Sequence, residues 1–439
     1  MARRRLLVDI TPLRLSADFR WLFGGQLVST LGSQLTVVAV PYQVFRITHS
    51  SFQVGLVSLT QLGPLVVCSL IGGSVADAHD RRRLLLVVSL LAGAMSAALA
   101  INAGLGHPTL WPLFVFTAAQ AGLTGFYQPA YSAAIPNVVP TALLASAYAL
   151  GQVLMQVGAV AGPAVAGLLL AGAGPSTVYW CDTASFLICF AGVFFVRALP
   201  PPASEGHRPG LRSIAEGLAF LRGRQALQGV YLLDINAMVF GMPRALFPAL
   251  GTTVFHGGAS AVGYLYAAPG AGALVGAITT GWVGRVHRQG RAVVIAVLAW
   301  GAAITAFGFS PWLPVALVLL AVAGWADVIS AVFRNTILQL SVPDRLRGRL
   351  SSVQIAVVTG GPRLGDVEAG GVAAAIGTRL SVISGGVACI AGAVALALAL
   401  PGFRNQHAGA GIGAADSDPP APSGRASCPD PPAPAGRTP

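Results

Sequence analysis

The sequence predicts an all-α membrane protein with twelve transmembrane helices arranged as two six-helix halves. Three observations support this fold class: an apolar composition, twelve apolar runs long enough to cross a membrane, and a repeat that relates the two halves. Of the 439 residues, 54% are hydrophobic and only 10% are charged, and the mean hydropathy is +0.71. Because soluble domains carry about 25% charged residues, this composition argues against a soluble globular protein.

The charged residues also exclude several classes of function. The formal net charge is +12, every basic residue is an arginine, and the sequence contains no lysine. Such a chain has neither the phosphate-binding loop that needs a lysine nor Schiff-base chemistry. The arginines separate apolar runs, which argues against nucleic-acid binding. The five cysteines and seven histidines show no metal-ligand spacing, so we expect no metal, no cofactor and no enzymatic activity.

The apolar runs set the positions of the helices, because about 20 apolar residues are needed to cross the hydrocarbon core. The first run follows Arg3-Arg4-Arg5, which resembles the basic start of a signal peptide. Charged residues interrupt the apolar stretch that a signal peptide needs, so we expect an uncleaved first helix. The predicted spans are 19–45, 52–76, 84–104, 111–135, 143–172, 177–197, 226–250, 259–284, 291–310, 312–340, 350–375 and 378–400.

The arginines predict the orientation, because cytoplasmic loops hold the excess of positive charge. Most of them fall in every second segment between spans, beginning with residues 1–18, whereas only Arg46 and Arg379 fall in the alternate loops. This alternation requires an even number of spans. We therefore expect a multi-pass protein of the cytoplasmic membrane with both termini in the cytoplasm.

Two segments outside the spans carry their own patterns. The linker 198–225 has four apolar residues at helical spacing: Leu211, Ile214, Leu218 and Leu221. This spacing indicates an amphipathic helix on the inner membrane surface, with an ordinary soluble loop helix as the alternative. The tail 401–439 is rich in Pro, Gly, Ala and Ser with few large apolar residues, so we expect it to be disordered.

An internal repeat relates the halves 19–197 and 226–400. At a constant separation, Val54-Gly55 and Gly73 in the first half match Val262-Gly263 and Gly281 in the second. Glycines let neighbouring helices approach closely. Repeated six-helix halves are typical of transporters that bind a substrate between the halves near mid-membrane.

The loop after the second span contains a pattern of one glycine, one carboxylate and three arginines: Gly73, Asp77, Arg81, Arg82 and Arg83. It resembles the G-x-x-x-D-(R/K)-x-G-R-R signature of the major facilitator superfamily, although Ala78 and Asp80 replace a basic residue and a glycine. The resemblance implies that Asp77 faces the start of the eleventh helix near Arg349–Ser352 and closes a cytoplasmic gate. A carboxylate at that positive helix end gains about 0.3–1 kcal/mol. The alternative is an arginine cluster that only fixes the topology.

The fifth span contains Gly158, Gly162, Pro163 and Gly167. These residues resemble the G-x-x-x-G-P-x-x-G-G motif of the superfamily's antiporters, with Ala166 in place of one glycine. The resemblance implies a proton-tight hinge. We expect the three glycines on or near one helix face, against a helix of the other half, with the proline kinking the helix. Ordinary close packing is the alternative.

A closer resemblance is to the bacterial enterobactin-exporter branch, which also includes macrolide and multidrug efflux pumps. The stretches that carry it are spread through 10–400 and include Asp18-Phe19-Arg20, Gln53–Leu56, Gly263–Ala268 and Gly348-Arg349. The resemblance implies the major facilitator fold and export as the direction of transport. It leaves the substrate open, because a fold alone does not determine function.

Charged residues inside the predicted spans are functional candidates, because each costs about 2.5–3.5 kcal/mol at a helix centre. They are Asp182, Asp234, Arg244, Asp327, Arg334, Arg363, Asp366 and Glu368. Asp327 and Arg334 share a helix face, and Arg363 is close enough in sequence to pair with Asp366. The alternative for any of these residues is a structural salt bridge between helices.

A proton carrier needs a carboxylate whose environment changes during transport. The first span has no acid, so we expect coupling elsewhere. Asp327 and Asp366 lie nearest the middle of the membrane. Their Asn variants, and not Asp182→Asn, are expected to uncouple transport, with Asp234 and Glu368 as the next candidates.

The sequence therefore predicts a secondary active transporter, with no ATP-binding motif, that exports a hydrophobic or aromatic molecule by proton antiport with alternating access. A siderophore or an antibiotic-like compound is the expected substrate. The expected partners are this substrate, protons and the lipid bilayer, and the chain is expected to work as a monomer. The alternatives are an importer or uniporter of a small metabolite and a membrane receptor or enzyme that does not transport.

Overall fold

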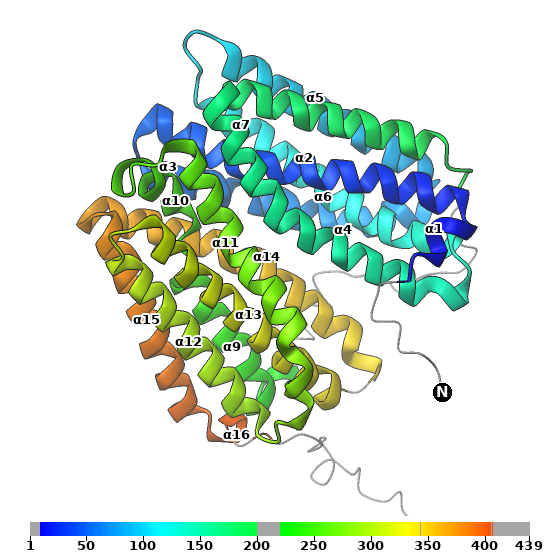
Figure 1. The fold of residues 1–439 in the computed structure, drawn as a ribbon. Coiled ribbons are helices and arrows are strands. Elements are labelled where there is room, and N and C mark those ends of the chain that lie inside the picture. Colours follow the sequence, from blue (N-terminus) through cyan, green and yellow to red (C-terminus); the bar gives the residue numbers. More distant parts are fainter. Residues whose placement is uncertain (1–8, 200–219, 343, 405, 407–439) are drawn as a thin grey trace, which may run out of the picture.

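The computed structural model describes residues 9–199, 220–342, 344–404 and 406, and this part of the chain is helical throughout, without strands. Figure 1 shows two bundles of helices in sequence order, one from each half of the chain. The linker helix expected around Leu211–Leu218 and most of the tail lie outside the described residues. The all-α fold expected from the sequence is confirmed.

The first half contains eight helical segments. They are α1 (Thr11–Leu15), α2 (Ala17–Thr48), α3 (Ser51–Thr60), α4 (Leu62–Ala78), α5 (Arg81–Gly104), α6 (Trp111–Val138), η1 (Thr141–Leu143) and α7 (Leu144–Phe194). The second predicted span is thus made of α3 and α4, which meet at Gln61. The fifth and sixth spans are both within α7, where Gly174 has a non-helical backbone with φ of 77°. Glycine is suited to this position because side chains disfavour positive φ.

The second half is made of α9 (Gln225–Phe240), η2 (Arg244–Leu246), α10 (Phe247–Ala249), η3 (Leu250–Val254), α11 (Gly258–Thr279), η4 (Thr280–Arg285), α12 (Gln289–Phe309), α13 (Leu313–Ser341), α14 (Asp344–Ile376), α15 (Thr378–Ala399) and α16 (Pro401–Arg404). The seventh predicted span is broken between α9 and η2. Pro243 has no N–H for the helix ladder, and the Trp300 indole donates to the Gly241 carbonyl at 2.7 Å.

The lengths of these helices agree with the predicted spans. Within the described residues, nine helical segments are long and apolar enough to cross a membrane, and one of them, Thr141–Phe194, includes both spans of α7. The remaining two, α6 and α14, are long enough but more polar, with Gln120 and Gln128 in α6 and Arg363 and Asp366 in α14. The arrangement is consistent with twelve spans.

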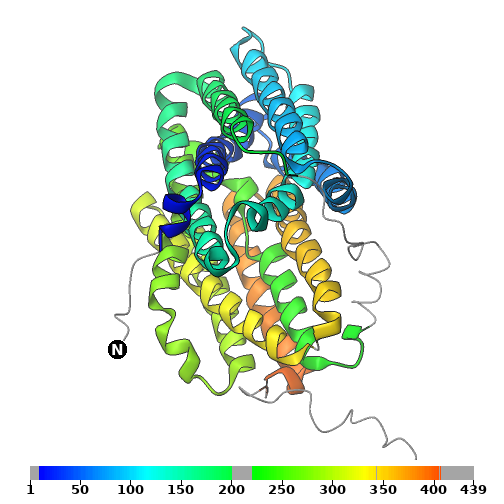
Figure 2. The ribbon, with the colours of Figure 1, turned by 90° about the vertical axis from the view of Figure 1, so that its right-hand side faces the viewer.

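The two halves meet at one end of the molecule and diverge at the other (Figures 1 and 2). We call the end with α3 and α10 the closed end and the end with α1 and α16 the open end. At the closed end, one buried apolar cluster combines residues of the first half with Ala245, Ala249, Ala259 and Val262 of the second. Toward the open end, the buried cluster around Phe19 and Leu85 contains residues of the first half alone.

The start of the tail differs from the prediction of disorder. Residues 401–404 form α16, and the Phe403 ring is fully buried. The ring packs against Gly229 in α9, and the backbone carbonyl of Phe403 lies against Gly290 in α12, so a side chain at either glycine would collide with Phe403. A single large apolar residue is enough to extend the second half beyond residue 400.

Candidate functional site

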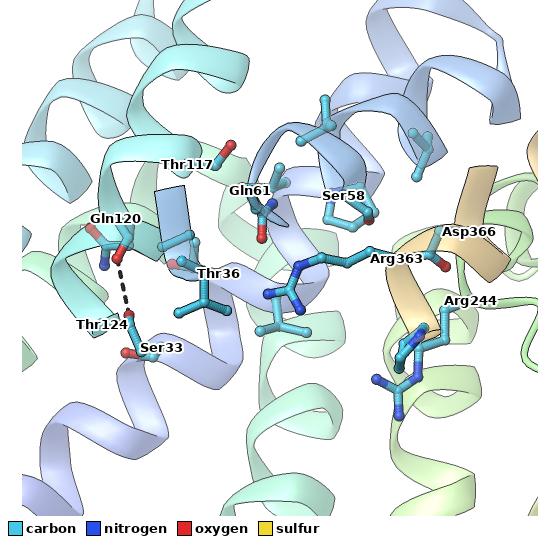
Figure 3. Close-up of a pocket in the computed structure, with 18 of the residues that line it drawn as sticks. Ser33, Thr36, Ser58, Gln61, Thr117, Gln120, Thr124, Arg244, Arg363 and Asp366 are labelled. Carbon is cyan, nitrogen blue, oxygen red and sulfur yellow. Dashed lines mark hydrogen bonds between the residues drawn. The ribbon is translucent and has the colours of Figure 1, made fainter. Parts of the chain in front are cut away.

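A cavity of about 330 Å³ lies between the two halves and is lined by residues of both (Figure 3). The first half contributes uncharged polar side chains: Ser33, Thr36, Ser58, Gln61, Thr117, Gln120 and Thr124. The second half contributes Arg244, Tyr266, Arg363 and Asp366. All the charged lining residues therefore come from one half. Ser33, Gln120 and Thr124 also line an adjoining cavity of about 170 Å³ inside the first half.

The broken seventh span positions the carboxylate of this cavity. Asp366 in α14 is buried, and its Oδ1 accepts a hydrogen bond from the Ala245 backbone N–H at 3.0 Å. Ala245 lies in the first turn after the break. The start of a helical segment has free N–H groups and a positive dipole end, which favour a negative group. The break between α9 and η2 thus holds a carboxylate at the wall of the cavity.

Two arginines face the same cavity. Arg363 donates to the Thr359 carbonyl at 2.6 Å, and its guanidinium extends away from Asp366 toward Gln61 (Figure 3). The predicted pair of Arg363 with Asp366 is therefore not formed in this conformation. Arg244 is exposed in the cavity. These arginines leave hydrogen-bond donors for a polar group of a bound molecule.

Three of the other predicted charges form one cluster outside this lining. Arg334 Nη1 lies 2.9 Å from Asp234 Oδ1, and both side chains are buried. Arg334 Nη2 lies 3.8 Å from Asp327 Oδ1, whose side chain is 40% exposed. The predicted Asp327–Arg334 pair is present, and Asp234 joins it from α9. Glu368 is half-buried in α14 and does not line the cavity.

Asp182 has a different environment. It is fully buried in the second part of α7 and accepts hydrogen bonds from Thr36 of α2 at 2.7 Å and from Ser96 of α5 at 2.8 Å. Sequence reasoning did not find this hydroxyl shell, because the donors lie far from Asp182 along the chain. The only signal was a carboxylate in an otherwise apolar span.

The loop motif lies at the open end. Asp77 is half-exposed at the end of α4, and its Oδ1 lies 3.8 Å from Arg81 Nη2. Arg81 is buried and donates to the Ala133 carbonyl of α6, Arg82 donates to the Phe194 carbonyl, and Arg83 is exposed. The expected partners near Arg349–Ser352 belong to a stretch whose side chains, apart from Leu350, lie outside the described residues. Within the described part, α14 packs along α3 much more than along α4.

The glycines of the fifth span face two different helices, which corrects the expectation of one shared face. A Cβ at Gly158 would lie 3.3 Å from Thr30 of α2, and one at Gly162 would collide with Gln34 of the same helix. A Cβ at Gly167 would lie 2.8 Å from the Gly263 Cα of α11. Positions 158 and 167 are two and a half helical turns apart, and hence on opposite faces. Only the Pro163–Gly167 face contacts the other half.

The glycines of the internal repeat occupy matching places. Gly55 of α3 lies against the backbone of Asp366 in α14, and Gly263 of α11 lies against Pro163 and Gly167 in α7. We call these contacts the α3–α14 seam and the α7–α11 seam. Each seam joins the two halves toward the closed end, and each needs a glycine because two helix backbones touch there.

The described residues contain no group of three or more potential metal ligands.

Comparisons with known proteins agree with this architecture. Residues 8–411 match the family described as transmembrane secretion effector. The chain is 30% identical over 404 residues to the enterobactin exporter EntS of Escherichia coli O1:K1 / APEC, covering 92% of this chain and 97% of that protein. It is 29% identical over 405 residues to EntS of Escherichia coli (strain K12), with the same coverage.

Solved transporter structures show the same fold at low sequence identity. The nucleoside transporter NupG superposes with a TM-score of 0.70 at 12% identity, covering 87% of this chain and 99% of that one. A bacterial homolog of the human lysosomal transporter Spinster, in an inward-facing and unoccupied conformation, gives a TM-score of 0.68 at 16% identity, with 88% and 95% covered.

Proposed function

The chain belongs to the transmembrane secretion effector family of the major facilitator superfamily and is a membrane efflux transporter, and we propose that it exports a siderophore or an antibiotic-like aromatic compound by proton antiport. The observation that carries this proposal is the central cavity, closed toward α3 and lined by hydroxyl and amide groups on one side and by two arginines and a carboxylate on the other. Such a lining suits an amphipathic ring compound with several polar groups.

The orientation supports loading from the cytoplasm. The arginine distribution along the sequence favours a cytoplasmic position for the open end, with α1 and α16. In this orientation the halves of the described conformation diverge toward the cytoplasm. The substrate enters there, and alternating access then requires the α3–α14 and α7–α11 seams to separate while the open end closes.

The siderophore assignment rests on the relatives, which are named enterobactin exporters and are similar to this chain over nearly their whole length. The cavity is compatible with it, because Arg244, Arg363 and the hydroxyl of Ser33 are suited to hydroxyl or carboxylate groups of a ligand.

Proton coupling supplies the energy in this proposal. Asp366 is the carboxylate at the cavity wall, and Asp327 is the half-exposed member of the charge cluster. A substrate that contacts Arg363 and Arg244 changes the charge environment of Asp366, so binding and protonation affect one another. One charge moving through 100 mV releases about 2.3 kcal/mol, enough for a roughly fifty-fold substrate gradient.

The cytoplasmic gate in this proposal is formed by the loop motif. Asp77 and Arg81 already pair at the end of α4. When the halves close at the open end, the exposed part of Asp77 meets the start of α14. The positive end of that helix then stabilises the outward-facing state.

Uptake into inverted membrane vesicles tests the direction and the coupling together. Vesicles with the chain should accumulate enterobactin when their lumen is acidic, and the accumulation should collapse when the gradient is dissipated. Arg363→Gln should reduce uptake, whereas Arg379→Gln, at an exposed position in α15 away from the cavity, should leave it near the wild-type level. Accumulation only in right-side-out vesicles would instead support an importer.

A further inference from the structure

The environment of Asp182 differs from that of every other buried carboxylate in the described spans. Asp234 has Arg334 as an ion-pair partner, and Asp366 has a backbone N–H and two nearby arginines. Asp182 is 0% exposed. Within the described residues it makes no ion pair, and its partners are hydroxyl groups. A buried charge without a counter-charge is costly, so a carboxyl group here needs a proton or several hydrogen-bond donors.

The hydroxyl shell can accommodate both the charged and the protonated form. Ser96 Oγ lies 2.8 Å from Asp182 Oδ2 and 3.2 Å from the Tyr179 carbonyl oxygen. Ser185 Oγ lies 2.7 Å from the backbone carbonyl of Asp182 and 3.4 Å from its Oδ1. Each hydroxyl has one proton, so it donates either to the carboxylate or to a carbonyl. When the carboxyl group is protonated, its O–H donates to a hydroxyl oxygen and Ser96 turns to the Tyr179 carbonyl.

One member of the shell connects Asp182 to the central cavity. Thr36 lines that cavity (Figure 3), and its hydroxyl donates to Asp182 Oδ2 at 2.7 Å. A proton can therefore pass by relay. A hydronium ion in the cavity gives a proton to Thr36 Oγ and becomes water, while Thr36 gives its own proton to Asp182 Oδ2, so one proton leaves the cavity and one arrives on the carboxylate.

The groups that face Asp182 from the neighbouring helices are uncharged. In the described part, α2 presents Thr36 and the small Gly32, and α5 presents Ser96. The titratable neighbour is Tyr179, one turn away in α7, and its hydroxyl donates to Gln43 Oε1 at 2.8 Å. The protonation of Asp182 is thus controlled by this hydroxyl shell and by access through Thr36.

We infer that Asp182 is a protonation site of the first half, filled and emptied from the substrate cavity through Thr36, and that transport coupled to protons requires it. This inference rests on the proton antiport proposed above, and it replaces the expectation that Asp182 has no part in coupling. It adds a site in the first half to the carboxylate Asp366 of the second half.

Infrared spectroscopy and vesicle uptake test the inference with matched variants. In purified full-length protein, acidification should produce a carboxylic acid C=O band that is absent in Asp182→Asn. In inverted vesicles, Asp182→Asn should bind enterobactin but lose the response of uptake to a proton gradient. Thr36→Val should keep the carboxylic acid band of Asp182 but lose most of the response of uptake to the gradient. Thr36→Ser, which retains a hydroxyl, should restore that response.

The control is Thr183→Val, since the Thr183 hydroxyl is also buried in α7 but donates to the Tyr179 carbonyl and not to Asp182. It should behave as wild type. A full gradient response in Asp182→Asn, or equal effects of Thr36→Val and Thr183→Val, would overturn the inference while leaving the proposed export intact. If Asp182→Asn does not fold, the Thr36 and Thr183 variants decide. If uptake by the wild-type protein is the same with and without a proton gradient, the proposed proton antiport is contradicted as well.

Discussion

At the scale of single residues, the buried carboxylates are distinguished by what holds them. Asp366 accepts from a backbone N–H at the break of the seventh span, Asp234 is paired with Arg334, and Asp182 is surrounded by hydroxyls. A backbone donor remains in place when the side chain is protonated, whereas an arginine that loses its partner is left with an uncompensated charge. Asp366 is therefore better suited to gain and lose a proton than Asp234.

We predict that Asp366→Asn abolishes gradient-driven export and leaves the protein folded. The Asn side-chain oxygen can still accept from the Ala245 N–H, so the closed end keeps its hydrogen bond. Uptake of enterobactin into inverted vesicles with and without an imposed proton gradient measures the effect. Asp18→Asn is the control, since Asp18 lies away from the cavity and its partner Arg197 is 87% exposed, and a pair with such an exposed partner contributes only about 0–1 kcal/mol. Equal gradient responses in both variants would rule out Asp366 as a carrier.

We predict that Asp77→Asn slows transport at least several-fold with normal membrane insertion, because the loop arginines still fix the topology while the gate loses its charge. The measurement is the initial uptake rate at matched expression. Asp80→Asn is the control. Asp80 caps α5 by accepting from the Arg82 N–H at 2.9 Å, and Asn is an equally good cap. The gate assignment fails if Asp77→Asn transports as fast as Asp80→Asn.

At the scale of helices, the two seams show where the sequence repeat acts. Gly55 and Gly263 occupy equivalent positions, one in each half, and each lets a helix of one half touch the backbone of the other. A Cβ at Gly370 would lie 2.5 Å from the Ser51 carbonyl oxygen, so the α3–α14 seam continues toward the closed end. The seams are therefore contacts between helix backbones, with no long side chains between them at these glycines.

We predict that Gly167→Leu disfavours the described conformation and slows uptake, because a side chain there collides with Gly263 of α11. Overpacking of this kind costs about 1–3 kcal/mol, which corresponds to an equilibrium shift of about 5- to 150-fold. Gly151→Leu, in the same helix where an added Cβ meets nothing within 4 Å, should be near neutral. Gly162→Leu should instead reduce folding yield, since it collides with α2 of its own half. Similar uptake rates for Gly167→Leu and Gly151→Leu would contradict the seam.

The spans could be predicted from the sequence, because length and hydropathy are local properties that the bilayer imposes on each helix. The loop and fifth-span motifs could be found through their resemblance to the signatures of the superfamily. The neighbours of each side chain in the folded protein could not be predicted from the sequence. Asp234 joins Arg334 across a hundred residues, and Ser96 reaches Asp182 from another helix. A pattern along one helix gives its faces but not the helix that packs on each face, and the face of Gly167 was misjudged because nine residues make two and a half turns.

At the scale of the whole molecule, the described residues form two bundles that are joined mainly through the two seams and the cluster at the closed end. Transport in such a fold is expected to be a rocking motion of one half against the other, with little change inside each half. The Asp234–Arg334–Asp327 cluster lies within the second half. It should therefore move as part of that bundle.

We predict opposite distance changes at the two ends when the protein cycles. Spin labels at the exposed positions Ser74 and Arg285, at the open end, should come closer in the outward-facing state, while labels at His107 and Trp312 should separate. Double electron–electron resonance on protein in lipid, with the five cysteines replaced by serine, measures both pairs. Changes of the same sign at both ends would contradict a rocking motion.

In the orientation proposed above the closed end faces outward, and its turns then determine how much of the chain is accessible from outside the cell. In the described part, the chain reverses there over very short connections, such as Gly174 and Gly377, and the longest is 105–110. The arginines on this side, Arg46 and Arg379, lie within helices. Trypsin added to intact cells should thus leave the chain whole, whereas trypsin added to inverted vesicles should cut it. Proteases and antibodies outside the cell would therefore find little accessible chain, and residues 105–110 are the best site for inserting an epitope tag for surface detection.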